Sequence, residues 1–285
     1  MSKPITLVLG GTGIKGAASI GVLQALHNNG VKIKKIIAAG ISAPISAQYA
    51  LGEDPDQLTE EFTRFFVENN HELWGLEQLT GILMSRRRRR LDNFAYFLRE
   101  RLYCHANFSS KGVLSWDTVE PQITRLFGDK SFSDLKVPLA VSAIDLKHGK
   151  LVLIEKGKLK DSLKASMAFP GILPPVVSGK MELVSSTVYS ELPLDGITKK
   201  DTPVIAIDLP DTTRGRSPQT LLEVISIVDD IRSQYIKKRL ITKADYIFQL
   251  QGMKKFRWGD YRQIPQIVAQ AAKETDRLLK RIELL

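Results

Sequence analysis

The sequence predicts an α/β fold in which helices cover a mostly parallel central sheet. Short, continuously apolar segments, typical of buried parallel strands, alternate with segments whose apolar residues recur at helical spacing. The first two apolar segments each run directly into a glycine-containing loop, the position where parallel sheets carry their sites. With 285 residues, 43% hydrophobic and 25% charged, the chain can bury one sizeable core, so we expect a single domain over residues 1–285.

The first quarter of the chain shows this alternation most clearly. A strand is predicted over 5–9, and a helix that ends in a glycine follows over 17–29. A second strand, over 33–39, leads into a helix over 43–51. A further helix, over 56–68, begins after an Asp-Pro pair, because proline is favoured in a first helical turn.

The segment 70–112 interrupts the alternation. It mixes apolar clusters with a run of arginines and a predicted helix over 93–102, and strands resume after it, so we expect a cap or lid inserted into the domain. The elements predicted beyond it are helix 116–127, strands 139–144 and 150–154, helix 159–169, strands 183–189 and 204–207, helix 217–240, strand 246–249 and helix 265–284.

A formal net charge of +10 predicts an anionic partner, either nucleic acid or an acidic membrane surface. The basic run lies among tryptophan, phenylalanine and leucine, which is the composition of interfacial membrane segments, although a solvated charged run is the alternative. No helix-turn-helix, zinc-finger or aromatic RNA-stacking pattern accompanies the charge, which disfavours nucleic acid. The candidate membrane-contact residues are Trp74, Arg86, Arg87, Arg88, Arg89 and Arg90.

Other classes of protein are disfavoured by what the sequence lacks. A single cysteine, Cys104, excludes an intramolecular disulfide framework and cannot alone supply a thiolate metal cluster, so we expect no metal. The sequence contains no leader-like start and no run of about 18 apolar residues. We therefore expect a cytoplasmic protein that associates peripherally with the membrane.

The loop after the first strand, Gly11-Thr12-Gly13-Ile14-Lys15-Gly16, satisfies the pattern G-x-G-x-x-G. A dinucleotide site would also need an acidic residue at the end of the second strand to bind ribose, and that strand ends in Ala38-Ala39-Gly40. The spacing of a P-loop is absent as well. We therefore interpret the segment as an oxyanion-binding loop, whose glycines let backbone N–H groups converge on developing negative charge.

The second strand ends in the turn Gly40-Ile41-Ser42-Ala43-Pro44. This is the pattern of a nucleophile elbow, G-x-S-x-G, with Pro44 where the second glycine is expected. Alone, Ser42 could equally be an ordinary helix N-cap. A glycine loop and a serine elbow on two successive strands together predict an acyl hydrolase site, with Pro44 narrowing the approach to the serine.

Residues 7–17 and the elbow closely resemble the patatin-like phospholipases of bacterial type. The resemblance continues through 138–146, 165–175 and 204–209. It implies a three-layer α/β/α fold with a mostly parallel central sheet, and cleavage of lipid esters by a Ser-Asp dyad that uses neither histidine nor cofactor. It gives Ser42 the role of nucleophile, with a lipid or acyl ester as substrate. The implied oxyanion-hole residues are Gly11, Gly13, Ile14, Lys15 and, through its N–H, Ala43.

The chain departs from the family pattern at the dyad aspartate. In the family this residue begins an Asp-Gly-Gly or Asp-Gly-Ala element shortly before a Leu-Pro pair, and counting back from Leu192-Pro193 leads to Ser185. A serine hydroxyl is not a useful base near neutral pH, so Ser42 would lack its proton acceptor. The sequence therefore predicts a degenerate site whose activity is weak or lost.

Three acidic residues near this position are candidates for a substitute base. Glu182 and Glu191 flank it in the sequence, and Glu191 shares a face with Ser185 only if the strand continues past Tyr189. Asp195 lies beyond the Leu-Pro pair, and Asp195-Gly196 is also a common turn dipeptide.

Three functional hypotheses follow from these residues. The first is a lipid acyl hydrolase of weak or lost activity, and the second is a working hydrolase with an unusual base. The third is a non-catalytic module that binds acyl chains or anionic membrane and acts through a partner.

Overall fold

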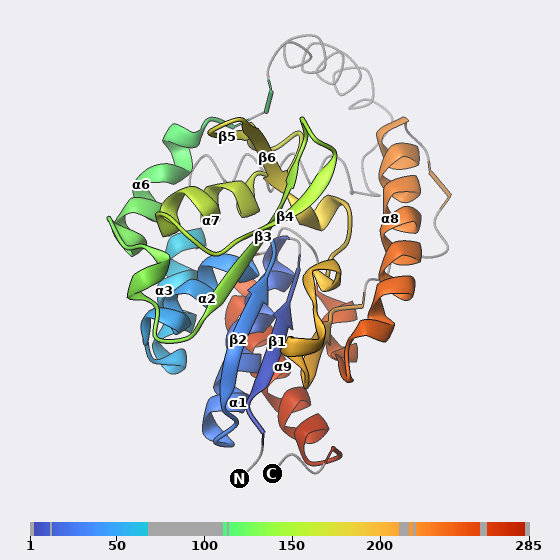
Figure 1. The fold of residues 1–285 in the computed structure, drawn as a ribbon. Coiled ribbons are helices and arrows are strands. Elements are labelled where there is room, and N and C mark those ends of the chain that lie inside the picture. The colour runs from blue at the N-terminus through green and yellow to red at the C-terminus, as the bar shows by residue number, and fades with distance from the viewer. Residues whose placement is uncertain are drawn as a thin grey trace.

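The computed structural model describes residues 3–11, 13–67, 111–112, 114–210, 217–218, 221–256 and 261–282. Helices cover a mostly parallel sheet in this part of the chain, as the sequence predicts (Figure 1). Most of the predicted cap over 70–112 lies outside the described residues, as do its helix over 93–102, Trp74 and the arginines 86–90. A single domain over the whole chain therefore stays a prediction.

The centre of the sheet consists of parallel strands in the order β3-β2-β1-β7-β8, joined by helical crossovers. Antiparallel strands extend it beyond β3, where β4 and β6 both pair with β3 and β5 pairs with β6. The described strands are β1 (Ile5–Leu9), β2 (Ile33–Ala38), β3 (Leu139–Asp145), β4 (Lys150–Ile154), β5 (Val176–Ser178), β6 (Met181–Ser185), β7 (Val204–Asp208) and β8 (Tyr246–Gln249).

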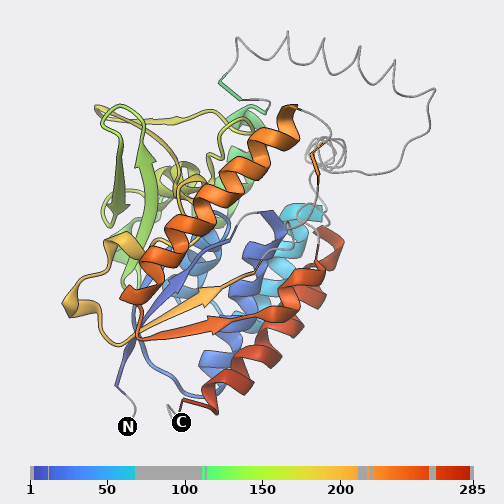
Figure 2. The same cartoon turned by 90° about the vertical axis from the view of Figure 1, so that its right-hand side faces the viewer.

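Helices α1, α2 and α9 pack on one face of the sheet, while the segment 186–201 and the end of α8 cover the other. Figure 2 shows α8 crossing the outside of the molecule. None of the described helices is long and apolar enough to cross a membrane. The described helices are α1 (Ala18–Asn28), α2 (Ser42–Leu51), α3 (Pro55–Val67), α6 (Trp116–Phe127), α7 (Leu159–Met167), α8 (Leu221–Leu240) and α9 (Ile264–Leu279), with 3₁₀ turns that include η1 (Gly13–Ala17) and η3 (Ser186–Val188).

The core explains why the central strands are apolar throughout. All five residues of β1 are buried, because β1 has packed layers on both faces. On one side of β1, Leu7 and Leu9 join the large cluster formed with α1 and α9, and on the other side Val8 joins a smaller cluster under 186–201.

The structure differs from the sequence-based elements mainly near the predicted acid position. The strand predicted over 183–189 ends at Ser185, because the Ser185 hydroxyl accepts a hydrogen bond from the Thr187 N–H and the chain turns into η3. The preceding strand β5 was not predicted, since it is three residues long. The last helix ends at Leu279 rather than residue 284.

The register of β3 places the end of β6 beside the end of β2. Val141 pairs with both Ala38 of β2 and Ile154 of β4, so β2 and β4 lie on opposite edges of β3. Ala143 pairs with both Ser185 of β6 and Val152 of β4, so β6 also lies opposite β4. Strands β2 and β6 therefore share one edge of β3. They approach each other end to end, because β6 runs antiparallel.

Candidate active site at the carboxyl ends of the central strands

The glycine loop and the serine elbow contact each other backbone against backbone. Gly40 has φ +62°, and a Cβ placed on it would lie 2.7 Å from the Gly11 carbonyl oxygen and 2.9 Å from Thr187 Cγ2. A Cβ on Gly16 would lie 2.7 Å from the Ile41 Cβ. The two predicted segments thus form one site, and its glycines are required by close approach as well as by backbone conformation.

Ser42 is the first residue of α2 and is fully buried. Its hydroxyl donates to the Gly10 carbonyl at 2.8 Å and accepts a hydrogen bond from the Ser19 hydroxyl at 2.7 Å. Both partners are neutral, and a peptide carbonyl is not a base that can take up the serine proton. The sequence reasoning missed Ser19, whose only signal was a polar residue among the apolar residues at the start of α1.

Of the predicted oxyanion-loop residues, Gly11 precedes η1, whereas Gly13, Ile14 and Lys15 lie in η1, which leads directly into α1. Gly13, Ile14 and Lys15 are buried, with Lys15 only 6% exposed. The N–H groups at the start of this helical segment carry partial positive charge, which suits an anion. The Ala43 N–H, predicted as a further donor, donates to the Gly40 carbonyl at 3.2 Å, so in this structure it serves the turn of the elbow.

Pro44, the departure from the elbow pattern, occupies the third position of α2 and is buried. The first N–H groups of a helix have no carbonyl partner within it, so a proline there removes no helical hydrogen bond. The elbow therefore forms despite the missing glycine.

Ser185, which the sequence predicts at the position of the family's aspartate, ends β6 and is 1% exposed. By register it lies two residues along the β3 edge from the end of β2, which corresponds to about 7 Å of strand. Its hydroxyl is hydrogen bonded to the Thr187 hydroxyl at 2.8 Å, and its N–H donates to the Ala168 carbonyl at 3.0 Å. Hydroxyl groups thus occupy the end of β6, where the sequence predicts the family's acid position.

Each candidate substitute base is paired with a lysine. Glu182 lies three residues before Ser185 on β6, so its side chain is on the opposite face of the strand. The Lys111 ammonium donates a hydrogen bond to the Glu182 carboxylate at 2.6 Å and lowers the pKa of that carboxyl. Asp195 accepts a hydrogen bond from Lys243 at 3.2 Å.

Glu191 also fails the condition that the sequence set for it. The strand stops at Ser185, so strand alternation does not carry Glu191 to the face of Ser185. The Glu191 carboxylate instead lies 3.0 Å from the Lys237 ammonium.

Lys237 is the centre of a buried ionic cluster that the sequence reasoning did not find. Its ammonium lies 2.8 Å from Asp208, and the other Asp208 oxygen accepts from Gln249 at 2.9 Å. Burial lowers the pKa of Lys237, but the charges of Glu191 and Asp208 outweigh this effect and raise it. A Cβ on Gly10 would overlap the Glu191 carbonyl oxygen, so this cluster holds the segment after Ser185 directly against the glycine loop. The sequence contained one indication of this cluster, because Asp208 is an acid at the end of a buried strand.

An acid–histidine pair occurs in the hairpin between β3 and β4, away from Ser42. The fully buried Asp145 carboxylate lies 2.5 Å from Nδ1 of His148, whose side chain is 52% exposed. Burial raises the pKa of Asp145. Hydrogen bonds from His148 and from the N–H groups of Glu182 and Lys147 outweigh this effect, so the pKa is lowered overall. Asp145 lies four residues beyond the β3 residue that pairs with the end of β2, so this pair stabilises the hairpin tip.

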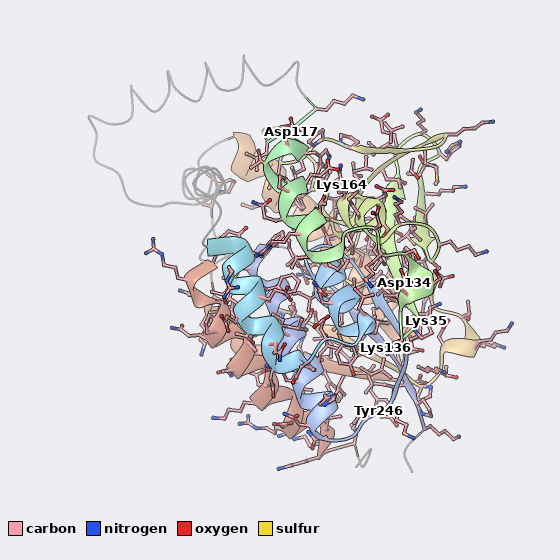
Figure 3. All side chains as sticks on the ribbon, turned by 90° about the vertical axis from the view of Figure 1, so that its left-hand side faces the viewer. Lys35, Asp117, Asp134, Lys136, Lys164 and Tyr246 are labelled. Atoms are coloured by element: carbon pink, nitrogen blue, oxygen red, sulfur yellow. The ribbon has the colours of Figure 1, made fainter. Side chains whose placement is uncertain are left out.

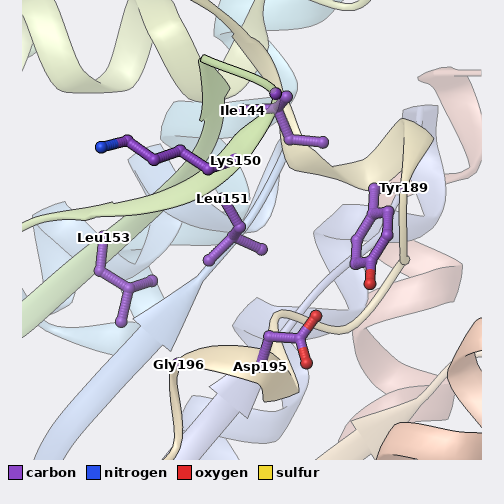
Figure 4. A pocket seen from close by; sticks show the side chains of 8 residues that line it. Ile144, Lys150, Leu151, Leu153, Tyr189, Asp195 and Gly196 are labelled. Carbon is purple, nitrogen blue, oxygen red and sulfur yellow. The ribbon is translucent and has the colours of Figure 1, made fainter. Parts of the chain in front are cut away.

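A cavity of about 440 Å³ lies beside the same hairpin (Figure 4). It is lined by aliphatic side chains of β3 and β4 together with Tyr189 and Asp195, and Ser42 does not contribute to it. Burial, and then the charge of Asp195, raises the pKa of Tyr189. The described residues contain no group of three or more acidic, histidine or cysteine side chains that could hold a metal ion.

Comparisons with known proteins identify relatives of this chain. An uncharacterized NTE family protein of Mycobacterium bovis is 27% identical over 200 residues, covering 68% of this chain and 45% of that protein. Patatin-like phospholipase domain-containing protein 6 of Homo sapiens is 27% identical over 176 residues, covering 62% of this chain and 11% of that protein. The chain thus spans less than half the length of these relatives.

The solved structure of VipD from Legionella pneumophila has the same fold, with a TM-score of 0.51 at 13% identity, over 98% of this chain and 67% of that one. A family model described as patatin-like phospholipase matches residues 7–198, which is more than half of the chain. The chain therefore belongs to the patatin-like phospholipase family.

Proposed function

We propose that this protein binds a lipid or acyl ester at Ser42 and hydrolyses it weakly or not at all. The observation that carries the proposal is the environment of the Ser42 hydroxyl, which is hydrogen bonded to Ser19 and to the Gly10 carbonyl. It is supported by the sequence-based assignment of Ser185 to the position of the acid. The family supplies the class of substrate.

The expected loss of rate follows from the chemistry of the missing group. General base catalysis contributes about 10²–10⁴ in rate, and removing one member of a coupled nucleophile and base can cost more. The oxyanion loop alone would retain transition-state stabilisation on the order of 10²–10³. The proposal is thus a site that recognises the ester and lacks the means to activate its nucleophile.

A non-catalytic role is the second candidate. Hydroxyl groups fill the acid position, and the buried Ser186 hydroxyl beside it has no hydrogen-bond partner. Such a site can accommodate an acyl ester or carboxylate without cleaving it, and the protein would then act through a partner. We also place this protein in the cytoplasm and at the membrane surface, with Trp74 and the arginines 86–90 as the contact residues. If removal of the five arginines left vesicle binding unchanged, the proposed contact would be rejected.

Restoring the acid tests the proposal. Ser185→Asp places a carboxylate where the Thr187 hydroxyl and N–H can support it, and Ser185→Asn is the matched control of equal shape without a base. We expect hydrolysis of a soluble short-chain ester, and fluorophosphonate labelling of Ser42, to rise about 10²–10⁴-fold in Ser185→Asp and to stay at the native level in Ser185→Asn.

A second variant covers the case in which the neighbouring side chains obstruct the new acid. Thr187 crowds Gly40, so Ser185→Asp combined with Ser186→Gly and Thr187→Gly restores the complete family element. If the native chain hydrolyses esters at ordinary enzymatic rates and Ser42→Ala abolishes this activity, the proposal of a weak or silent site is wrong.

A further inference from the structure

Helix α8 presents a continuous apolar stripe to solvent. Val224, Val228, Ile231 and Tyr235 are between 44% and 64% exposed. Their spacing of four, three and four residues places them on one face of the helix. Figure 2 shows this helix lying across the outside of the molecule. Large exposed side chains aligned in this way mark an interaction surface.

Basic side chains extend the same face toward the end of the helix. Lys238 follows Ile231 by seven residues, Arg239 follows Tyr235 by four, and both are exposed. The Arg239 guanidinium lies 5.8 Å from the centre of the Tyr235 ring. Among the α8 side chains that the structure describes, the exposed charged ones are Arg232, Lys238 and Arg239, all basic.

Polar contacts on the opposite face and on one flank of α8 anchor the helix to the protein. Lys237 forms the buried cluster with Asp208 and Glu191, and Arg232 donates to the Val188 carbonyl at 3.4 Å. These contacts hold α8 over the segment that follows Ser185 and leave its apolar stripe outward.

Some lysines elsewhere on the molecule are paired with acids. On the side seen in Figure 3, Lys164 pairs with Glu120 at 2.7 Å, and Lys35 pairs with Glu155 at 2.8 Å. On α8, by contrast, the exposed Lys238 and Arg239 form no ion pair with any residue that the structure describes, and they lie beside an apolar stripe.

We propose that the outward face of α8 docks on an anionic lipid surface. Apolar side chains bordered by lysine and arginine are the composition of helices that lie in the membrane interface, where the apolar groups enter the headgroup boundary and the cations meet lipid phosphates. The inference rests on the proposed function only in that a lipid ligand brings the protein to a membrane. It adds a second contact, independent of the arginines 86–90.

Sedimentation of the full chain with vesicles tests the proposal. We compare vesicles of phosphatidylcholine alone with vesicles that also contain phosphatidylglycerol, and we expect binding to the anionic vesicles that weakens with salt. Val228→Ser with Ile231→Ser should weaken this binding at least about tenfold, since each side chain loses its burial in the interface. Lys238→Ser with Arg239→Ser should weaken it roughly 25-fold, about fivefold for each charge.

The matched control removes one exposed apolar and one exposed basic side chain from the hairpin between β5 and β6. Val177→Ser with Lys180→Ser should bind anionic vesicles as the native chain does. All α8 variants replace exposed residues, so thermal unfolding should be unchanged within the scatter typical of surface substitutions. Hydrolysis by Ser185→Asp is measured on a soluble ester without vesicles, so a failure there bears on the proposed function alone.

Three results would overturn the docking proposal. The native chain fails to bind anionic vesicles, or both α8 double variants bind them as tightly as the native chain does. Alternatively, light scattering shows a dimer that the Val228→Ser and Ile231→Ser pair converts to a monomer, which would mean that a second copy of the chain covers the stripe.

Discussion

Replacing Gly40 by alanine tests whether the elbow and the glycine loop are held together by direct backbone contact. Two costs are expected at this position. The backbone has φ +62°, where a Cβ costs about 1–2 kcal/mol. The new Cβ would also lie 2.7 Å from the Gly11 carbonyl oxygen and 2.9 Å from Thr187 Cγ2, and overpacking of this kind costs about 1–3 kcal/mol.

Gly30→Ala is the matched control for this substitution. Gly30 has φ +65°, nearly the same backbone conformation, but a Cβ there would meet no atom within 4 Å. Gly30→Ala should therefore lower the free energy of unfolding by the conformational cost alone, and Gly40→Ala by about 1–3 kcal/mol more. The difference between the two variants isolates the close approach of the elbow to the loop.

The free energy of unfolding is measured by urea denaturation of both variants and of the native chain. The m-value should be the same for all three, so that the free energies can be compared. Fluorophosphonate labelling of Ser42 in Ser185→Asp, with and without Gly40→Ala, then reports whether displacement of the elbow disturbs the site. Equal losses of stability in Gly40→Ala and Gly30→Ala would refute the reasoning, because they would mean that the loop and the elbow do not contact each other as the structure shows.

Two further predictions concern ionised groups. Lys237→Met leaves the buried Asp208 carboxylate without its cation and should cost about 3–5 kcal/mol in urea unfolding, whereas Lys238→Met, at the exposed neighbour, should change stability by less than about 0.5 kcal/mol. The pKa of Lys237 is raised in the folded state. Its contribution to the free energy of unfolding should therefore be full below the unfolded-state pKa near 10.5 and be lost as pH rises through the folded-state pKa. A native chain whose stability does not fall in that pH range would contradict this prediction. The pKa of Asp145 is lowered, so its contribution should be full above about 3.8 and be lost as pH falls through the folded value. Asp145→Asn should flatten the acid limb of stability against pH, and Asp161→Asn, at an exposed acid, should leave it unchanged.

Most elements could be predicted because their signals are local. Strand β1 and helix α6 have the predicted bounds, since continuous apolar runs and helical spacing with a serine cap are visible in a short stretch of sequence. The strand predicted over 183–189 was too long because its end depends on a side-chain hydrogen bond between Ser185 and Thr187. Propensity does not report such a contact.

The candidate site divides in the same way. The contact between the glycine loop and the elbow followed from the sequence, because parallel neighbouring strands bring their carboxyl ends to one edge of the sheet. The assignment of Ser185 to the position of the family's acid came from counting along one segment, and it stays a prediction. The buried cluster around Lys237 did not follow from the sequence, since its members come from three separate segments whose packing no local pattern reports.

The sequence by itself thus determined the α/β order of elements, the family, and a serine elbow beside a glycine loop, and it predicted a hydroxyl at the position of the family's acid. Tertiary structure alone decided what the Ser42 hydroxyl binds, that Glu191 is held by Lys237, and that the ends of β2 and β6 share one edge of β3. The physical reason is the sequence distance over which each kind of interaction acts. Elements follow from the periodicity of neighbouring residues, whereas hydrogen-bond and ion-pair partners depend on the packing of segments that the chain order leaves far apart.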